Sequence, residues 1–97
     1  MGLGIRRLNR ARDVVEEFGD DAEDRFREMC ARAPENSLLY GVSPYGLTMF
    51  NALQLERFVV ELEALPEEEK KKPVVQRVIE AGHHVIRQSG YLLFIGD

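Results

Sequence analysis

Two adjacent histidines and one cysteine are the residues whose types could support chemistry in this 97-residue chain. His83 and His84 stand next to each other in a helical pattern, so their side chains point about 100° apart and cannot easily share a metal ion. Cys30 lies between Met29 and Ala31 in a helical pattern, and a nucleophilic cysteine usually needs a positioned histidine base. We therefore predict no metal site, and we expect Cys30 to be a small core residue.

The other patterns that carry chemistry are missing from the sequence. The chain contains no glycine-rich phosphate loop and no zinc or calcium motif, and its three serines stand outside any nucleophile-elbow sequence. The many carboxylates fall on the predicted solvent faces of helices, where no desolvated pair is available for acid–base catalysis. We predict no catalytic residue and no cofactor, and we expect that the protein is not an enzyme.

Charge is unevenly distributed along the chain, whose net charge is −4. Four arginines occur between positions 6 and 12, and an acidic block follows over residues 13–24. An acidic surface repels phosphate backbones, so direct nucleic-acid binding is not expected, and three glutamates nearly neutralise the lysines at 70–72. The acidic block either suits docking onto a basic protein or solvates an exposed helix face.

The N-terminal residues carry positive charge without a following apolar segment, which is not the pattern of a secretory signal. Gly2 would suit lipid attachment, but Arg6 stands where that motif requires Ser or Thr. No apolar run reaches the length of a membrane span. We therefore expect a cytoplasmic protein with no membrane partner.

An apolar stripe predicts that the first third of the chain is helical. Apolar residues recur at steps of three and four from Leu8 to Ala33, and most positions between them are charged. Gly19 interrupts the stripe without changing its phase, and Asp20 with Glu23 fits a capping box for a second helix. The pattern is compatible with one long helix, but it favours a break or kink at Gly19.

Two short apolar segments predict a β-hairpin in the middle of the chain. Residues Ser37–Val42 are bounded by turn residues and favour a strand, and Leu47–Phe50 can return as a second strand. Between them, Ser43–Gly46 has the proline and the glycine of a β-turn, which places Tyr45 at the hairpin tip. Tyrosine on a rigid turn is a common binding anchor, and the alternative is that its ring folds back onto the sheet.

Two further helices are predicted from capping and periodicity. Asn51 and Gln54 form a capping box before an apolar stripe that runs from Leu55 to Leu65. After a charged connection, Pro73 is well placed as the first residue of another helix. Gly82 lies on the apolar face of that helix and indicates a close crossing with another element.

The last segment, Tyr91–Ile95, is continuously apolar and predicts a central strand that pairs with one strand of the hairpin. The sequence therefore predicts a single α+β domain over residues 1–97, in which a three-stranded sheet packs against three to four helices. The predicted order is helix (one or two), strand, strand, helix, helix, strand.

Two segments, Tyr40–Asn51 (YGVSPYGLTMFN) and Tyr91–Asp97 (YLLFIGD), resemble small bacterial proteins of the toxin-immunity type. The resemblance covers about a third of the chain, and its motifs are turn and strand patterns. It implies a cytoplasmic inhibitor that blocks the active site of a toxin, as acidic immunity proteins do with basic nuclease toxins. It identifies no binding residue.

These observations favour a protein-binding module, in particular an intracellular immunity or antitoxin-type inhibitor whose partner is a basic toxin. The alternative is a structural or regulatory subunit that self-associates through the Leu8–Ala33 helix, whose near-heptad spacing would suit a helix–helix dimer. The oligomeric state, monomer or homodimer, stays open. The predicted partner-binding residues are Tyr45, Asp20, Asp21, Glu23, Asp24 and Glu56.

Overall fold

The computed structural model describes residues 2–96 and has the predicted α+β fold, with four strands and four helices. The prediction of three strands is wrong, because the N-terminal region forms two strands and the predicted strand Ser37–Val42 is absent from residues 2–96. The strands are β1 (Gly4–Leu8), β2 (Val14–Gly19), β3 (Leu47–Asn51) and β4 (Tyr91–Ile95). The helices are α1 (Arg25–Ala31), α2 (Ala52–Glu63), α3 (Glu67–Lys70) and α4 (Pro73–Gln88).

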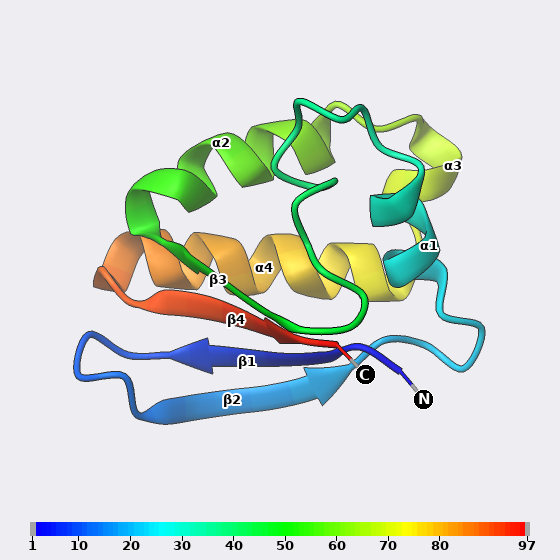
Figure 1. The fold of residues 1–97 in the computed structure, drawn as a ribbon. Coiled ribbons are helices and arrows are strands. Elements are labelled where there is room, and N and C mark those ends of the chain that lie inside the picture. Colours follow the sequence, from blue (N-terminus) through cyan, green and yellow to red (C-terminus); the bar gives the residue numbers. More distant parts are fainter. Residues whose placement is uncertain (1, 97) are drawn as a thin grey trace.

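The strands form one antiparallel sheet in the order β2-β1-β4-β3 (Figure 1). β4 lies in the interior of the sheet and buries Leu92 and Phe94. The prediction of a central C-terminal strand is therefore confirmed. Its pairing with the segment that begins at Leu47 is also confirmed, and Met49 lies opposite Leu93 in that pair.

Residues 4–19 form the β1–β2 hairpin, so the predicted helix from Leu8 to Ala33 is wrong for most of its length. The hairpin places the buried Ile5 opposite Phe18. Because side chains alternate between the two faces of a strand, the same face also carries Arg7 and Glu16. These two charges occupy positions where apolar residues are expected, and they conceal the period of two in the sequence.

Cross-strand ion pairs accommodate the charged residues of this hairpin. Arg7 Nε lies 3.0 Å from Glu16 Oε1, and Arg6 Nε lies 2.6 Å from Glu17 Oε2 on the opposite face. Solvation of a helix face was one of the two alternatives for these charges. Arg6, Arg7, Glu16 and Glu17 instead form pairs across two strands, which is a favourable arrangement of opposite charges in a sheet.

Only α1 remains of the predicted N-terminal helix. It buries Phe26, Met29 and Cys30, which belong to the apolar stripe in the sequence. Gly19 is the last residue of β2. The break at this glycine is therefore a change from strand to helix and not a kink within a helix.

The predicted strand Ser37–Val42 is wrong, and with it the hairpin whose tip would be Tyr45. Residues 32–46 form a loop of consecutive turns, which buries Leu39 and Val42. The N–H groups of Leu38 and Leu39 donate to the two carboxylate oxygens of Glu61 on α2, each at 3.0 Å. A side chain thus satisfies peptide groups that the prediction assigned to a strand partner.

The capping box and the close helix crossing are confirmed. Asn51 and Gln54 exchange backbone-to-side-chain hydrogen bonds of 2.9 Å in both directions at the start of α2, and Pro73 begins α4. A Cβ atom on Gly82 would lie 2.8 Å from Cγ2 of Val59, so only glycine lets α4 approach α2 so closely.

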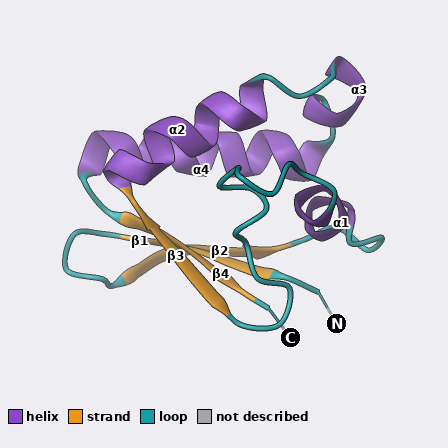
Figure 2. Ribbon diagram, turned by 45° about the horizontal axis from the view of Figure 1, so that its top comes forward, coloured by secondary structure: helices purple, strands orange, loops and turns teal. Residues whose placement is uncertain are grey.

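The helices and the long loop lie on one side of the sheet, and no helix formed by residues 2–96 covers the other side (Figures 1 and 2). Between the two layers, Phe94 packs against Phe26, Phe50 and Phe58 at ring-centroid distances of 5.7 to 6.1 Å. We call the uncovered side of the sheet the outer face. Among residues 2–96, no helix is both long and apolar enough to cross a membrane.

Candidate functional site

The aromatic side chain of Tyr45 is the most prominent group predicted for partner binding, and 75% of the residue is exposed. It lies in the loop that leads into β3, where its N–H donates to Ser43 Oγ at 3.2 Å. The guanidinium carbon of Arg27, on α1, lies 5.4 Å from the centre of the Tyr45 ring. This distance is within the range of a cation–π contact, so Arg27 supports the ring from one side and leaves it accessible.

A groove of about 420 Å³ adjoins this contact, between α1 and the loop. Tyr40, which is 45% exposed, stands at the groove, and Pro44 contributes to its wall. We call the surface formed by Arg27, Tyr40, Pro44 and Tyr45 the tyrosine groove. It combines exposed aromatic area with a concave region, which suits a side chain inserted by a protein partner.

Asp20 and Asp21 were predicted to bind a partner, but their carboxylates are engaged in building the start of α1. Asp20 accepts hydrogen bonds from the N–H groups of Phe26 (3.0 Å) and Arg27 (2.8 Å). Asp21 accepts from the N–H of Arg25 at 3.0 Å. The first N–H groups of a helix have no partner within the helix, and these two carboxylates supply it from the preceding turn.

The predicted capping box of Asp20 and Glu23 is wrong, because α1 begins at Arg25 and its N-cap residue is Asp24. Asp20 binds N–H groups of α1 from the preceding turn, whereas Glu23 is exposed and its carboxylate pairs with the side chain of Arg25. Asp24 has a left-handed backbone conformation, with φ of 55°, at the position just before α1. Glu23 and Asp24 lie at the N-terminal end of α1, the helix that contributes Arg27 to the tyrosine groove.

Glu56 lies apart from the other predicted partner-binding residues. Tyr45 comes two residues before β3, and Glu56 lies in the helix that directly follows β3. β3, which is roughly 17 Å long, lies between the two along the chain. Glu56 is not among the residues that line the tyrosine groove.

A second groove, of about 520 Å³, lies between α1, the loop and the end of α2. Its lining is mainly apolar and includes Met29, Leu39 and Leu65, with Glu61 at one side. The Glu61 carboxylate is occupied by the loop N–H groups described above, so its role here is to hold the loop in place. Nothing in the sequence distinguishes Glu61 from its exposed neighbours on α2, because the loop that it binds is distant in sequence.

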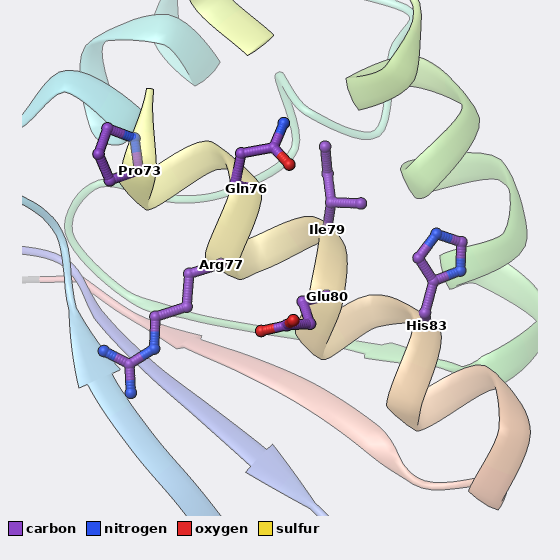
Figure 3. Close-up of a pocket in the computed structure, with 6 residues that line it drawn as sticks. All are labelled: Pro73, Gln76, Arg77, Ile79, Glu80 and His83. Atoms are coloured by element: carbon purple, nitrogen blue, oxygen red, sulfur yellow. The ribbon is translucent and has the colours of Figure 1, made fainter. Parts of the chain in front are cut away.

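His83, one of the two adjacent histidines, lines a third hollow on the surface of α4. The hollow is lined only by residues of α4, among them Arg77, Glu80 and His83, so it has no opposing wall (Figure 3). His83 Nε2 lies 3.6 Å from a Glu63 oxygen, whereas His84 Nδ1 lies 3.1 Å from an Arg87 nitrogen. Within residues 2–96, no group of three or more His, Cys, Asp or Glu side chains is arranged to hold a metal ion.

Cys30 lies in the core with 2% of its surface exposed, as predicted from its apolar neighbours. Burial raises the pKa of the Cys30 thiol far above its ordinary value, and the nearby charges of Asp20 and Glu61 raise it further. The thiolate is the reactive form of cysteine, so this environment makes the side chain unreactive.

Tyr45, at the tyrosine groove, is the most exposed aromatic residue among residues 2–96. Comparisons of the chain with protein-family models, with curated proteins and with solved structures found no match.

Proposed function

We propose that this chain is a protein-binding module whose partner docks on the tyrosine groove. The observation that carries the proposal is the exposure of aromatic side chains around a concave surface. Tyr40 and Tyr45 are 45% and 75% exposed, and both belong to the tyrosine groove. Tyrosine contributes a large contact area at a low cost in conformational entropy, which makes it a frequent energetic centre of interfaces.

We further propose that the module is an inhibitor of the immunity or antitoxin type and that its partner is a basic protein. The net charge of −4 supports this, since opposite charge accelerates association. Residues 20–32, which include α1, carry five carboxylates and three arginines and so have a local net charge of −2. The resemblance of Tyr40–Asn51 to toxin-immunity proteins covers the segment that holds both tyrosines. The proposal assigns binding and not catalysis to this chain.

Site-specific photo-crosslinking in the native host tests the tyrosine groove. A photo-reactive residue is placed at position 45 in one variant and at position 53 in another, because Tyr45 and Leu53 are both 75% exposed. We expect a discrete crosslinked species from position 45 and not from position 53. Equal crosslinking from both positions, or none from position 45, contradicts the proposed surface.

The inhibitor proposal is tested on the protein captured at position 45. We expect this protein to be basic and to be toxic when produced alone, with toxicity suppressed by co-production of this chain. Suppression by the Tyr45→Ala variant should be weaker than suppression by Leu53→Ala. A captured protein that is not toxic contradicts the inhibitor proposal but does not contradict docking on the tyrosine groove.

Self-association through the Leu8–Ala33 helix is not proposed further, because the structure contains no such helix. Residues 4–19 of this region form the β1–β2 hairpin, and α1 has only seven residues.

A further inference from the structure

The two edges of the sheet differ in how they are protected against pairing with another strand. At the β2 edge, Glu17 adds a charge and pairs with Arg6, and the register shifts between Arg7 and Leu8. Charged residues and bulges of this kind discourage association of edge strands. At the opposite edge, β3 (Leu-Thr-Met-Phe-Asn) has no charged residue, no proline and no register shift. The β3 edge is therefore the one open to strand pairing.

Hydrogen bonds near both ends of β3 show which of its peptide groups point away from the sheet. Gly96 N–H donates to the C=O of Gly46 at 2.7 Å, so the peptide groups of even-numbered residues are directed toward β4. Asn51 N–H donates instead to a side chain of α2 at 2.9 Å. Because these groups alternate along a strand, Leu47 and Met49 direct their N–H and C=O groups outward.

The side chains of the same two residues lie on the outer face. Leu47 is 72% exposed and Met49 is 42% exposed. On the neighbouring strand, Ile95 and Leu93 lie directly opposite them and are half-buried. Together these four side chains form an apolar strip that ends at the unprotected edge. Monomeric proteins seldom leave such an edge open, since unpaired strand groups beside apolar side chains favour association.

We propose that β3 pairs antiparallel with β3 of a second copy of this chain, about a two-fold axis at Thr48. In this register, Leu47 lies opposite Met49 of the second copy, and by symmetry Met49 lies opposite Leu47 of the second copy. Each outward N–H of these residues then meets an outward C=O of the other chain. This interaction goes beyond the proposed function, and it uses the edge of β3, which adjoins the tyrosine groove at Tyr45.

The sequence of β3 favours a second copy as the occupant because the strand is complementary to itself in this register. Apolar side chains meet on the outer face and Thr48 meets Thr48 on the helix side, and both kinds of cross-strand pair are favourable. Ser43 N–H donates to Thr48 Oγ1 at 2.9 Å, so the loop lies over the helix side of the strand and leaves the outer face uncovered.

The topology also limits the assembly to a dimer. Pairing through β3 joins the two sheets into one, and both ends of the joined sheet are then β2 edges. Since those edges carry the protective charge and bulge, the association closes at two chains and does not continue into a fibre.

A charge-pair experiment tests both the dimer and its register. Leu47→Lys and Met49→Glu are prepared separately and studied by sedimentation velocity between about 1 and 200 µM, the range expected for a small interface. We expect the wild-type chain to dimerise in this range, and each variant alone to dimerise at least about tenfold more weakly. An equimolar mixture should form a heterodimer, because the introduced lysine then lies opposite the introduced glutamate.

Leu53→Lys is the matched control, since Leu53 is 75% exposed on α2 and lies outside the sheet. It should dimerise like the wild type. A wild-type chain that stays monomeric up to 200 µM, or a mixture that forms no heterodimer, overturns the proposal. If Leu53→Lys weakens dimerisation as much as Leu47→Lys and Met49→Glu do, the proposal is also overturned.

Hydrogen exchange on the wild-type chain provides a measurement that does not depend on any variant folding. The amides of Leu47 and Met49 should exchange more slowly at 200 µM than at 1 µM, whereas the amides of β2 should not change. Exchange that is independent of concentration at both residues contradicts pairing through β3. In the proposed register position 45 lies close to Asn51 of the second copy, so a crosslink to this chain itself is separated by mass from a crosslink to a foreign protein. The first species reports on the dimer and the second on the proposed function, and their failures are therefore observed separately.

Discussion

Glu16 illustrates how single residues stabilise this fold through charge. Hydrogen bonding from Arg7 holds the pKa of Glu16 below its ordinary value, and a second bond from Arg77 acts in the same direction against the opposing effect of burial. Arg77 also lies over the ring of Phe18, at 4.2 Å from its centre. One carboxylate thereby connects β1, β2 and α4.

Replacement of Glu16 by glutamine should have an effect that depends on pH. Because the folded-state pKa is depressed, the ionised carboxylate contributes stability above the unfolded-state pKa, and this contribution is lost as the pH falls through the folded-state pKa. We expect Glu16→Gln to lower the free energy of unfolding at pH 7 by less than about 1 kcal/mol, and the difference to shrink below about pH 4. Urea denaturation at several pH values measures this, with the more exposed Glu17→Gln as control. A difference that grows as the pH falls contradicts the assignment.

Phe58 is the residue at which packing should matter most on α2. It is fully buried, and its ring lies 5.0 Å from Phe50 and 5.7 Å from Phe94. We expect Phe58→Ala to reduce the free energy of unfolding by about 3–5 kcal/mol. The control Val60→Ala, on the exposed face of the same helix, should change it by less than about 0.5 kcal/mol. Chemical denaturation of both variants measures these free energies of unfolding. A small effect of Phe58→Ala would contradict the packing of Phe58 against Phe50 and Phe94.

At the scale of elements, the crossing of α2 and α4 depends on Gly82. Alanine is favoured over glycine inside a helix by about 1 kcal/mol, so an uncrowded Gly82→Ala variant would be more stable than the wild type. The close Cγ2 of Val59 reverses this expectation, because a β-branched side chain in a helix has little freedom to move away.

We therefore expect Gly82→Ala to destabilise the protein by about 1–3 kcal/mol, through overpacking. The Val59→Ala change should offset part of this loss in the double variant, so that a double-mutant cycle shows favourable coupling between the two alanines. Thermal unfolding of the wild type, both single variants and the double variant gives the coupling energy. A more stable Gly82→Ala variant would show that the helices can move apart at little cost.

At the scale of the whole molecule, the C-terminal strand joins the two halves of the sheet. β4 pairs with β1 on one side and with β3 on the other. Without it, the β1–β2 hairpin and β3 have no common neighbour, and the core loses Leu92 and Phe94. The segment is therefore expected to be part of the cooperative folding unit.

Deletion of residues 91–97 should abolish cooperative unfolding, not merely shorten the chain. Circular dichroism with thermal melting measures this, and a chain ending at position 95 is the control because it keeps β4. A native-like cooperative melt in the longer deletion would show that the sheet does not need β4. Position 97 lies outside the described residues, and the prediction depends only on the strand.

The sequence by itself determined the elements whose signals are local. The capping box of Asn51 and Gln54, the proline at the start of α4, the glycine at the helix crossing and the apolar C-terminal strand were all predictable, because each depends on neighbours a few residues away. The α+β class follows from them. Exposure of Tyr45 was one of two alternatives that the sequence left open, in a hairpin that the structure does not contain.

Only the tertiary structure decided the elements whose hydrogen bonds and charges are satisfied at long range. The β1–β2 hairpin was missed because Arg7 and Glu16 neutralise each other on an inward face, which the spacing of apolar residues cannot indicate. The loop was mistaken for a strand because its peptide groups bind Glu61, a side chain more than twenty residues away. Asp20 and Asp21 likewise appeared available to a partner until their bonds to the start of α1 were visible. The physical reason is common to all three: a polar group's partner is set by the folded arrangement, whereas apolar periodicity and capping are already present in the chain.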